Sequence, residues 1–224
     1  MTLNISIIIP TLNEEDNIAL LAENIAGSDI EVIIVDGGSH DRTVELAEKN
    51  NFPILSSTQG RAAQLNLGAA EAKGDILIFL HADTRLPENY KEEVAKILGQ
   101  RENIAGAFRL SIENPTPAMR FIAACANLRS SLFQLPYGDQ AIFVHKKSFI
   151  RLNKFPELPI MEDYLFIKEA KKYGRIGLSK KCVKTSARRW SKLGTVRTTL
   201  INQLVIIGYY CGVSPRRLAS LYRR

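Results

Sequence analysis

Two aspartates follow apolar runs, at positions where a carboxylate could bind a ligand. Asp83 comes three residues after the apolar run 76–80. A charged side chain that is partly shielded from water needs a partner, and a divalent cation such as Mg²⁺ or Mn²⁺ is a natural one. An aspartate in this place can also cap a helix or form a turn, and for Asp83 taken alone that alternative is favoured.

Asp36 ends a second apolar run, 31–35, and precedes Gly37 and Gly38. The glycines let the chain turn tightly, so that backbone N–H groups can point at a ligand while the carboxylate reaches a ribose hydroxyl or a base. The pattern indicates a nucleoside site, although an Asp-Gly pair also makes ordinary turns. For His81 taken alone, a packed, hydrogen-bonded histidine is favoured over a ligand.

Alternating apolar runs and helical patterns must position these residues. The alternation predicts a parallel sheet with crossover helices, and runs that are apolar throughout fit strands covered on both faces. Ligands bind such sheets beyond the carboxyl ends of the strands, where both aspartates lie. The predicted strands are 6–9, 31–35, 53–56 and 76–80, and the predicted helices are 17–25, 43–50 and 61–72.

The pattern changes near residue 104, where a strand of mixed direction and then a helix at 117–133 are expected. We therefore predict an α/β domain over residues 1–192 with two halves, a nucleotide-binding half at 1–100, which holds both aspartates, and a second half at 101–192. A basic and apolar helical tail is expected over 193–224. The sequence contains no internal repeat or low-complexity linker that would mark a sharper boundary.

Three segments resemble family 2 glycosyltransferases in order and spacing. They are 7–15 (IIIPTLNEE), 33–39 (IIVDGGS) and 74–83 (GDILIFLHAD), and the similarity spans at least residues 5–190. The resemblance implies a GT-A fold, with a Rossmann-like, mostly parallel sheet flanked by helices, and a nucleotide-diphosphate sugar as donor, UDP by default and GDP as the alternative. The donor-binding residues that it implies are Pro10, Thr11, Asn13, Glu14, Asp36, Gly37, Arg61, His81, Ala82 and Asp83.

The segment His81-Ala82-Asp83 is similar to the Asp-x-Asp metal motif of that family. His81 stands where the first Asp usually lies, a position that contacts the sugar or ribose more than the metal. The expected cofactor, Mn²⁺ or Mg²⁺, therefore depends on Asp83 alone.

Glu162-Asp163 resembles the Glu-Asp motif that supplies the catalytic base, a role that the resemblance gives to Asp163. Inverting transfer needs a carboxylate to take the proton of the acceptor hydroxyl, while a cation stabilises the departing diphosphate. Without the resemblance, an acidic pair at a helix N-terminus is the better interpretation.

The resemblance makes residues 101–192 the acceptor half, and two further segments there resemble parts of the acceptor side. Gly138-Asp139-Gln140 is similar to the segment that precedes the base, with an ordinary turn as the alternative. Arg189-Trp190 is similar to half of the Gln-x-x-Arg-Trp motif of processive members, with Ser186 at the Gln position, which favours transfer of a single sugar. A basic surface pair with a packed Trp is the alternative for it. The implied acceptor or diphosphate contacts are Gly138, Asp139, Gln140, Glu162, Arg189 and Trp190.

Charge is unevenly distributed along the chain, whose net charge is +7. Residues 171–224 hold fourteen Lys or Arg and no Asp or Glu, so the first 170 carry −7. This asymmetry predicts contact with an anionic partner such as phospholipid head groups or a polyphosphate ligand, or else a solvated basic face. Nucleic acid is not expected, because Trp190, Tyr209 and Tyr210 are too few aromatics among these basic residues.

The segment 198–215 has no charged residue, but its Asn, Gln and Gly residues make a membrane-spanning helix the least favoured interpretation. Packing on the protein body or on a second copy in a homodimer is favoured, and an amphipathic helix in the membrane interface is the alternative. The N-terminus lacks a signal-peptide pattern, so we expect a cytoplasmic protein, peripheral on the inner face of the membrane if the basic region binds lipid. Cys125, Cys182 and Cys211 lack metal-site spacing and are interpreted as reduced packing residues.

Two other functions compete with the glycosyltransferase. A sugar-phosphate nucleotidylyltransferase shares this kind of sheet but needs a Gly-rich loop with a basic residue, which 10–15 lacks. A catalytically silent nucleotide-binding module at a membrane is the other alternative, and the presence of Asp36, Asp83 and Asp163 argues against it.

Overall fold

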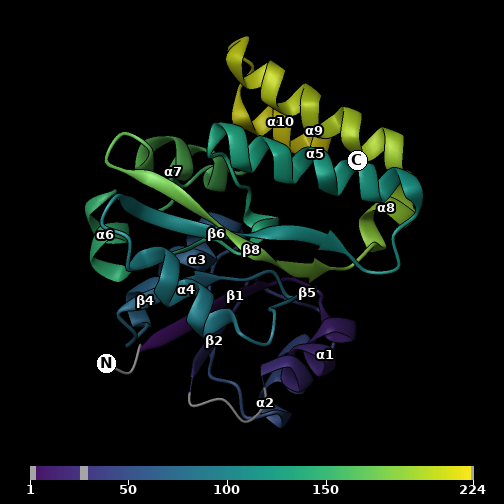
Figure 1. The fold of residues 1–224 in the computed structure, drawn as a ribbon. Coiled ribbons are helices and arrows are strands. Elements are labelled where there is room, and N and C mark those ends of the chain that lie inside the picture. The colour runs from purple at the N-terminus through teal and green to yellow at the C-terminus, as the bar shows by residue number, and fades with distance from the viewer. Residues whose placement is uncertain (1–3, 26–29, 223–224) are drawn as a thin grey trace.

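The computed structural model describes residues 4–25 and 30–222, in which eight strands form one sheet (Figure 1). The strand order is β3-β2-β1-β4-β7-β6-β8-β5. Strands β1 to β4 pair in parallel, β7 runs antiparallel to both β4 and β6, and β8 pairs in parallel with β6 and antiparallel with β5. The strands are β1 (Ile5–Thr11), β2 (Glu31–Asp36), β3 (Ile54–Ser56), β4 (Ile76–Phe79), β5 (Thr84–Arg85), β6 (Asn103–Ile112), β7 (Phe143–His145) and β8 (Arg175–Thr185).

Helices cover both faces of this sheet, as the continuous apolar runs predict. One face packs against α1, α2 and α4, and the other against α3, α6 and α7. The described helices are α1 (Glu15–Ile25), α2 (Thr43–Lys49), α3 (Arg61–Glu71), α4 (Tyr90–Leu98), α5 (Pro117–Phe133), α6 (Lys146–Arg151), α7 (Glu162–Ala170), α8 (Arg188–Leu193), α9 (Thr195–Tyr210) and α10 (Pro215–Tyr222), with a 3₁₀ turn at Gly138–Gln140.

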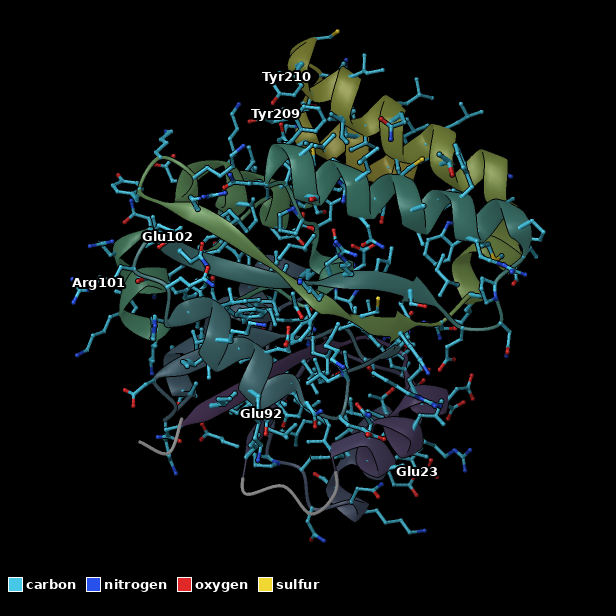
Figure 2. The ribbon with its side chains drawn as sticks, viewed as in Figure 1. Glu23, Glu92, Arg101, Glu102, Tyr209 and Tyr210 are labelled. Atoms are coloured by element: carbon cyan, nitrogen blue, oxygen red, sulfur yellow. The ribbon has the colours of Figure 1, made fainter. Side chains whose placement is uncertain are left out.

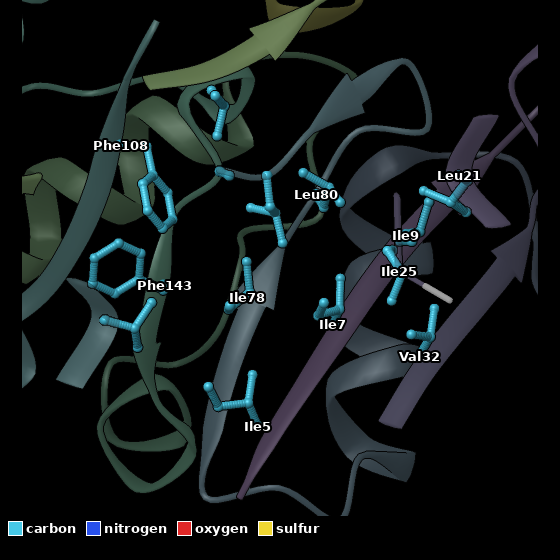
Figure 3. Close-up of a cluster of buried hydrophobic side chains, with 14 of the residues drawn as sticks. Ile5, Ile7, Ile9, Leu21, Ile25, Val32, Ile78, Leu80, Phe108 and Phe143 are labelled. Atoms are coloured by element: carbon cyan, nitrogen blue, oxygen red, sulfur yellow. The ribbon is translucent and has the colours of Figure 1, made fainter. Parts of the chain in front are cut away.

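The side chains of β1 alternate between two cores. Ile7 and Ile9 pack on the α1 side with Ile78 and Phe108 (Figure 3), whereas Ile8 packs on the α3 side. Helix α3 crosses this strand closely at Gly68, where an added Cβ would lie 2.5 Å from Ile8 Cγ2. Burial on both faces is what fixes these strands in the middle of the sheet.

The chain after β8 forms α8, α9 and α10, which lie beside α5 (Figure 1). Ile201 and Val205 of α9 and Leu218 of α10 are buried together with Met161 and Tyr164, so the apolar segment packs on the protein body, as one interpretation of the sequence expected. Among the residues described, none of the helices has the length and apolar character needed to cross a membrane.

The cysteines differ from the expectation. Cys125, Cys182 and Cys211 are free thiols, but all three are exposed, so their interpretation as packing residues is wrong. Isolated cysteines carry no helical or strand period that could have indicated which face they occupy.

Candidate active site

A cleft of about 1010 Å³ opens at the carboxyl ends of β1 and β4. The chain passes from β1 outward to β2 and β3, and then returns to β4 on the other side of β1. A reversal of strand order of this kind leaves a crevice where ligands bind. The cleft is lined from the donor segments by Pro10, Thr11, Asn13, Glu14, Arg61, His81, Ala82 and Asp83, and from the later segments by Asp139, Glu162, Asp163 and Trp190.

Hydrogen bonds join the loops after β1 and β2 into one unit. Asn13, which has a left-handed φ of 54°, donates its N–H to Ser39 Oγ at 2.8 Å. In return Asn13 Oδ1 accepts the N–H of His40 at 2.9 Å. This reciprocal pair holds the 10–15 loop against the glycine turn, and so fixes one wall of the cleft.

Asp36 is buried and holds the turn that follows it. Its carboxylate accepts the N–H groups of Gly38 and Ser39 at 2.8 and 2.9 Å and the Ser39 hydroxyl at 2.5 Å. Thr11 adds a longer bond to the same carboxylate at 3.3 Å. Asp36 therefore holds the Asp-Gly turn and is not among the described residues that line the cleft, so its contact with a nucleoside stays a prediction.

Gln64 of α3 joins the ends of β1 and β2. Its Nε2 donates to the carbonyls of Thr11 and Val35, both at 2.8 Å. An added Cβ at Gly37 would lie 3.0 Å from the same Nε2, so the glycine makes room for this bond. Gly37 thus supports the cleft wall rather than lining it.

Glu14 faces the cleft and binds the far end of the chain. Arg188 Nη2 lies 2.9 and 2.8 Å from its two carboxylate oxygens, and Asn17 donates to the carboxylate at 2.5 Å. Burial raises the pKa of Glu14, the positive charge of Arg188 lowers it, and the negative charge of Asp83 raises it. The acidic side chains of the loops after β1 and β4 are therefore close in space.

Asp83 lies on the wall of the cleft, just beyond β4. Its Oδ1 accepts long hydrogen bonds from Thr84 at 3.3 Å and from Thr185 at 3.5 Å. Across residues 4–25 and 30–222, no group of three or more His, Cys, Asp or Glu could hold a metal ion. A carboxylate that lines the cleft does fit a hard cation, provided that the remaining ligands are diphosphate oxygens and water.

His81 also lines the cleft and is neutral. Burial and the neighbouring positive charge of Arg61 lower its pKa to about 3. A neutral imidazole can donate or accept a hydrogen bond but adds no charge. At the first position of the motif, His81 thus differs from an aspartate in charge as well as in shape.

Arg61 of α3 and Glu162 of α7 both line the cleft and form an ion pair, with 3.5 Å between Nη1 and Oε1. Glu162 is buried, which raises its pKa, while Arg61 lowers it. For Arg61, desolvation lowers the pKa but the carboxylates of Glu162, Asp163 and Asp83 outweigh it. The pair places one positive charge among the acids of the cleft.

Asp163 lies at the start of α7 and is held by backbone groups. Its Oδ2 accepts the N–H of Gly138 at 2.5 Å, and its Oδ1 accepts that of Tyr164 at 2.7 Å. Met161, the residue before α7, has a left-handed φ of 70°, a strained conformation of a kind found at functional sites. An added Cβ at Gly138 would lie 3.0 Å from Asp163 Oδ2 and 3.1 Å from His81 Nε2.

Asp139 is the second acid on this side of the cleft, and its Oδ1 is buried with no hydrogen-bond partner among the residues that the structure describes. Burial raises its pKa to about 6, against the opposing charge of Arg129. Arg129 itself lies 3.4 Å from the centroid of the Tyr137 ring. A buried carboxylate oxygen without a partner has capacity to bind a ligand.

Gln140 is fully buried and has both ends of its amide bonded within the protein. Its Oε1 accepts from Ser130 at 2.7 Å and from Arg129 at 3.2 Å, and its Nε2 donates to the carbonyl of Phe108 at 3.0 Å. It positions the turn that carries Gly138 and Asp139, and does not line the cleft.

The Arg-Arg-Trp segment lies in α8, at the edge of the cleft. Trp190 lines the cleft and packs with Ile112, Met119 and Ala123. The side chain of Arg189 lies outside the described part of the structure, so its predicted phosphate contact stays a prediction. The neighbouring Arg188 is the residue that contacts Glu14.

Sequence reasoning missed several residues of the cleft, among them Gln64, Tyr137, Arg188 and Asn202. A buried glutamine on an apolar helix face is the one local signal that could have indicated Gln64. Tyr137 and Arg188 lie next to residues of the two acceptor-side motifs, which could have indicated them, whereas Asn202 comes from a segment without a motif and is brought to the cleft by long-range packing.

Comparison with known proteins places the sequence in a family. Residues 6–157 match the model of glycosyl transferase family 2. An uncharacterized glycosyltransferase of Haemophilus influenzae is 35% identical over 107 residues, which cover 45% of this chain and 36% of the relative. An undecaprenyl-phosphate 4-deoxy-4-formamido-L-arabinose transferase of Pectobacterium atrosepticum is 30% identical over 120 residues, covering 47% and 37%. The matches thus span little more than a third of these relatives.

Solved structures share the fold. The mannosyltransferase PcManGT from Pyrobaculum calidifontis, in complex with GDP-Man and Mn²⁺, has a TM-score of 0.71 at 18% identity, covering all of this chain and 69% of that one. S. aureus TarS 1–349 in complex with UDP-GlcNAc has a TM-score of 0.64 at 23% identity, covering 82% and 58%. These likenesses confirm the predicted GT-A fold.

Proposed function

The chain belongs to glycosyl transferase family 2, and from that premise we propose that it transfers one sugar, with inversion, from a nucleotide-diphosphate sugar to an acceptor hydroxyl. The observation that carries the proposal is the meeting of two segments at one point of the cleft. A Cβ added at Gly138 would lie 3.1 Å from Nε2 of His81, in the loop after β4, and 3.0 Å from Oδ2 of Asp163, in α7. A donor bound along the first segment would then present its anomeric carbon to the second.

In the proposed reaction, Asp163 accepts the proton of the acceptor hydroxyl as that oxygen attacks the anomeric carbon. The bond between that carbon and the diphosphate oxygen breaks, and the nucleoside diphosphate leaves. The N–H of Gly138 orients the Asp163 carboxylate. Arg61 places a positive charge in the cleft, where it would stabilise the departing diphosphate. A divalent cation held by Asp83 would neutralise diphosphate charge.

We propose a lipid-linked acceptor and a cytoplasmic enzyme that works at the inner face of a membrane. Support for the acceptor comes from the Pectobacterium relative, whose name specifies an undecaprenyl-phosphate substrate. The donor series is UDP by default, with GDP as the alternative. Asp139, with its unpartnered oxygen, is the proposed acceptor contact.

A thermal-shift screen tests the donor part of the proposal. A ligand that binds the native state raises its stability according to concentration and affinity, so one nucleotide series should raise the melting temperature, and more so with Mn²⁺. Asp83→Ala should remove the Mn²⁺ increment and leave the metal-free shift. The absence of a shift with any UDP-, GDP-, dTDP- or CDP-sugar would contradict the proposal.

A further inference from the structure

The outer faces of α5 and α9 are apolar, although both helices already bury their inner faces. On α5, Met119 and Ala123 pack inward, while Phe121, Leu128 and Leu132 point outward at helical spacing. These three are 71%, 59% and 65% exposed. A soluble helix normally presents polar residues on its outer face, so this stripe is unusual.

Helix α9 has the same property. Thr198, Asn202 and Val205 line the cleft, and on the opposite side of the helix Leu200, Leu204 and Ile207 are 58%, 51% and 57% exposed. Residues three and four apart share a face of a helix, so these three leucine and isoleucine side chains form a second stripe. We call the two stripes together the α5/α9 face.

The two helices that carry these stripes lie next to each other. Figure 1 shows α5 and α9 side by side, on the side of the molecule away from α1 and α2. A contiguous exposed apolar patch on a soluble protein marks an interaction site. The α5/α9 face therefore needs a partner with an apolar interior.

Charge decides which partner fits. Helices α5, α9 and α10 together contain five arginines and no Asp, Glu or Lys. Arg120, Arg197, Arg216 and Arg217 among these are exposed, whereas Glu23 and Glu92 lie at the opposite side of the molecule (Figure 2). A second copy docked through the same face would bring arginines against arginines, which opposes association.

We propose that the α5/α9 face binds the surface of an anionic lipid bilayer, with its apolar stripes in the acyl region and its arginines at the phosphate groups. Long arginine side chains reach head groups while neighbouring apolar groups insert. Anionic lipid attracts each positive charge near the surface. Helix α9 then has one side toward the cleft and the other toward the bilayer.

This arrangement has a consequence for the acceptor, which rests on the proposed function. The cleft wall formed by Thr198, Asn202 and Val205 lies one helix thickness from the membrane surface. A lipid-linked acceptor could reach the cleft past α9 without leaving the bilayer.

Vesicle co-sedimentation of the full chain tests the surface directly, without donor or acceptor. Wild type should bind phosphatidylcholine vesicles that contain phosphatidylglycerol, and bind pure phosphatidylcholine vesicles far more weakly. Leu204→Glu on α9 and Leu128→Glu on α5 should each reduce binding by roughly tenfold or more. The matched control is Ile150→Glu on α6, since Ile150 is 52% exposed and lies away from this face (Figure 1); it should bind as wild type does.

Three outcomes would overturn the inference: no binding of wild type to anionic vesicles, binding that Leu204→Glu and Leu128→Glu leave unchanged, or a wild-type dimer that Leu204→Glu dissociates while vesicles do not bind. Circular dichroism and nucleotide-induced thermal shifts on each variant separate a lost surface from a lost fold. Vesicle binding needs no turnover. A protein that does not bind vesicles would therefore not contradict the proposed transferase activity, and a protein without turnover would not contradict the proposed membrane surface.

Discussion

Replacing Gly138 by alanine should reduce turnover while leaving the fold and the donor site intact. The added methyl carbon would lie 3.0 Å from Asp163 Oδ2 and 3.1 Å from His81 Nε2, whereas ordinary contacts begin at 3.4 Å. The Asp163 carboxylate must therefore retreat by about 0.4 Å, and its 2.5 Å bond from the Gly138 N–H must lengthen.

The size of the effect follows from that bond. A hydrogen bond to a charged group contributes about 1.5–3 kcal/mol, and each 1.36 kcal/mol changes a rate about tenfold. If the bond is what orients the base, Gly138→Ala should lower kcat for nucleotide release from the donor by roughly ten- to a hundredfold. The backbone φ of Gly138 is outside the left-handed region, so alanine adds no backbone strain, and the weakened bond should lower the free energy of unfolding by no more than about 3 kcal/mol.

The assay follows nucleotide release at saturating donor, with water or acceptor as the attacking group. The thermal shift that the nucleotide produces serves as the control. A shift that matches that of wild type shows that the donor site tolerates the added carbon, which lies 3.1 Å from His81 Nε2. A variant that turns over at the wild-type rate would refute the positioning role of the Gly138 N–H.

Three further predictions concern charge and packing. Burial raises the pKa of Asp139 to about 6, so ionisation of Asp139 destabilises the fold as the pH rises through about 4 to 6. Asp139→Asn should therefore stabilise the protein by up to about 3 kcal/mol at pH 8 and by almost nothing at pH 4. Chemical denaturation midpoints at the two pH values measure the difference. Arg188→Ala removes the partner of Glu14, and because Arg188 is half exposed the loss in chemical denaturation should be about 1 kcal/mol or less, with faster amide exchange in α8. Gly68→Ala places a Cβ 2.5 Å from Ile8 Cγ2, so it should cost about 1–3 kcal/mol and lower the melting temperature; an unchanged melting temperature would contradict the close packing of α3 on β1.

The N-terminal half of the fold could be predicted from the sequence because its buried strands are continuous apolar runs. Ile7, Ile8 and Ile9 are all fully buried, and such runs indicate a central strand without knowledge of its neighbours. Strand β5 could not be predicted. It consists of Thr84 and Arg85, and pairing with a strand about a hundred residues later defines it.

The site was predictable in its location but less so in its contacts. The carboxyl ends of β1 and β4 are where the cleft opens. The direction of each side chain depends on bonds that spacing does not reveal. Asp36 turns toward its own loop, and Arg188 contacts Glu14, 174 residues away in the chain. Adjacent helix residues point about 100° apart, so the direction of Arg188 depends on how α8 packs.

Nucleotide release by wild type and by Asp163→Asn tests the central claim most directly. Asparagine keeps the shape of the side chain and cannot accept the proton, so the variant should bind the same nucleotide with the same thermal shift. Its turnover of the matching nucleotide sugar should fall by about a hundredfold or more. Turnover that Asp163→Asn leaves unchanged would contradict the assignment of the base and with it the proposed geometry of transfer.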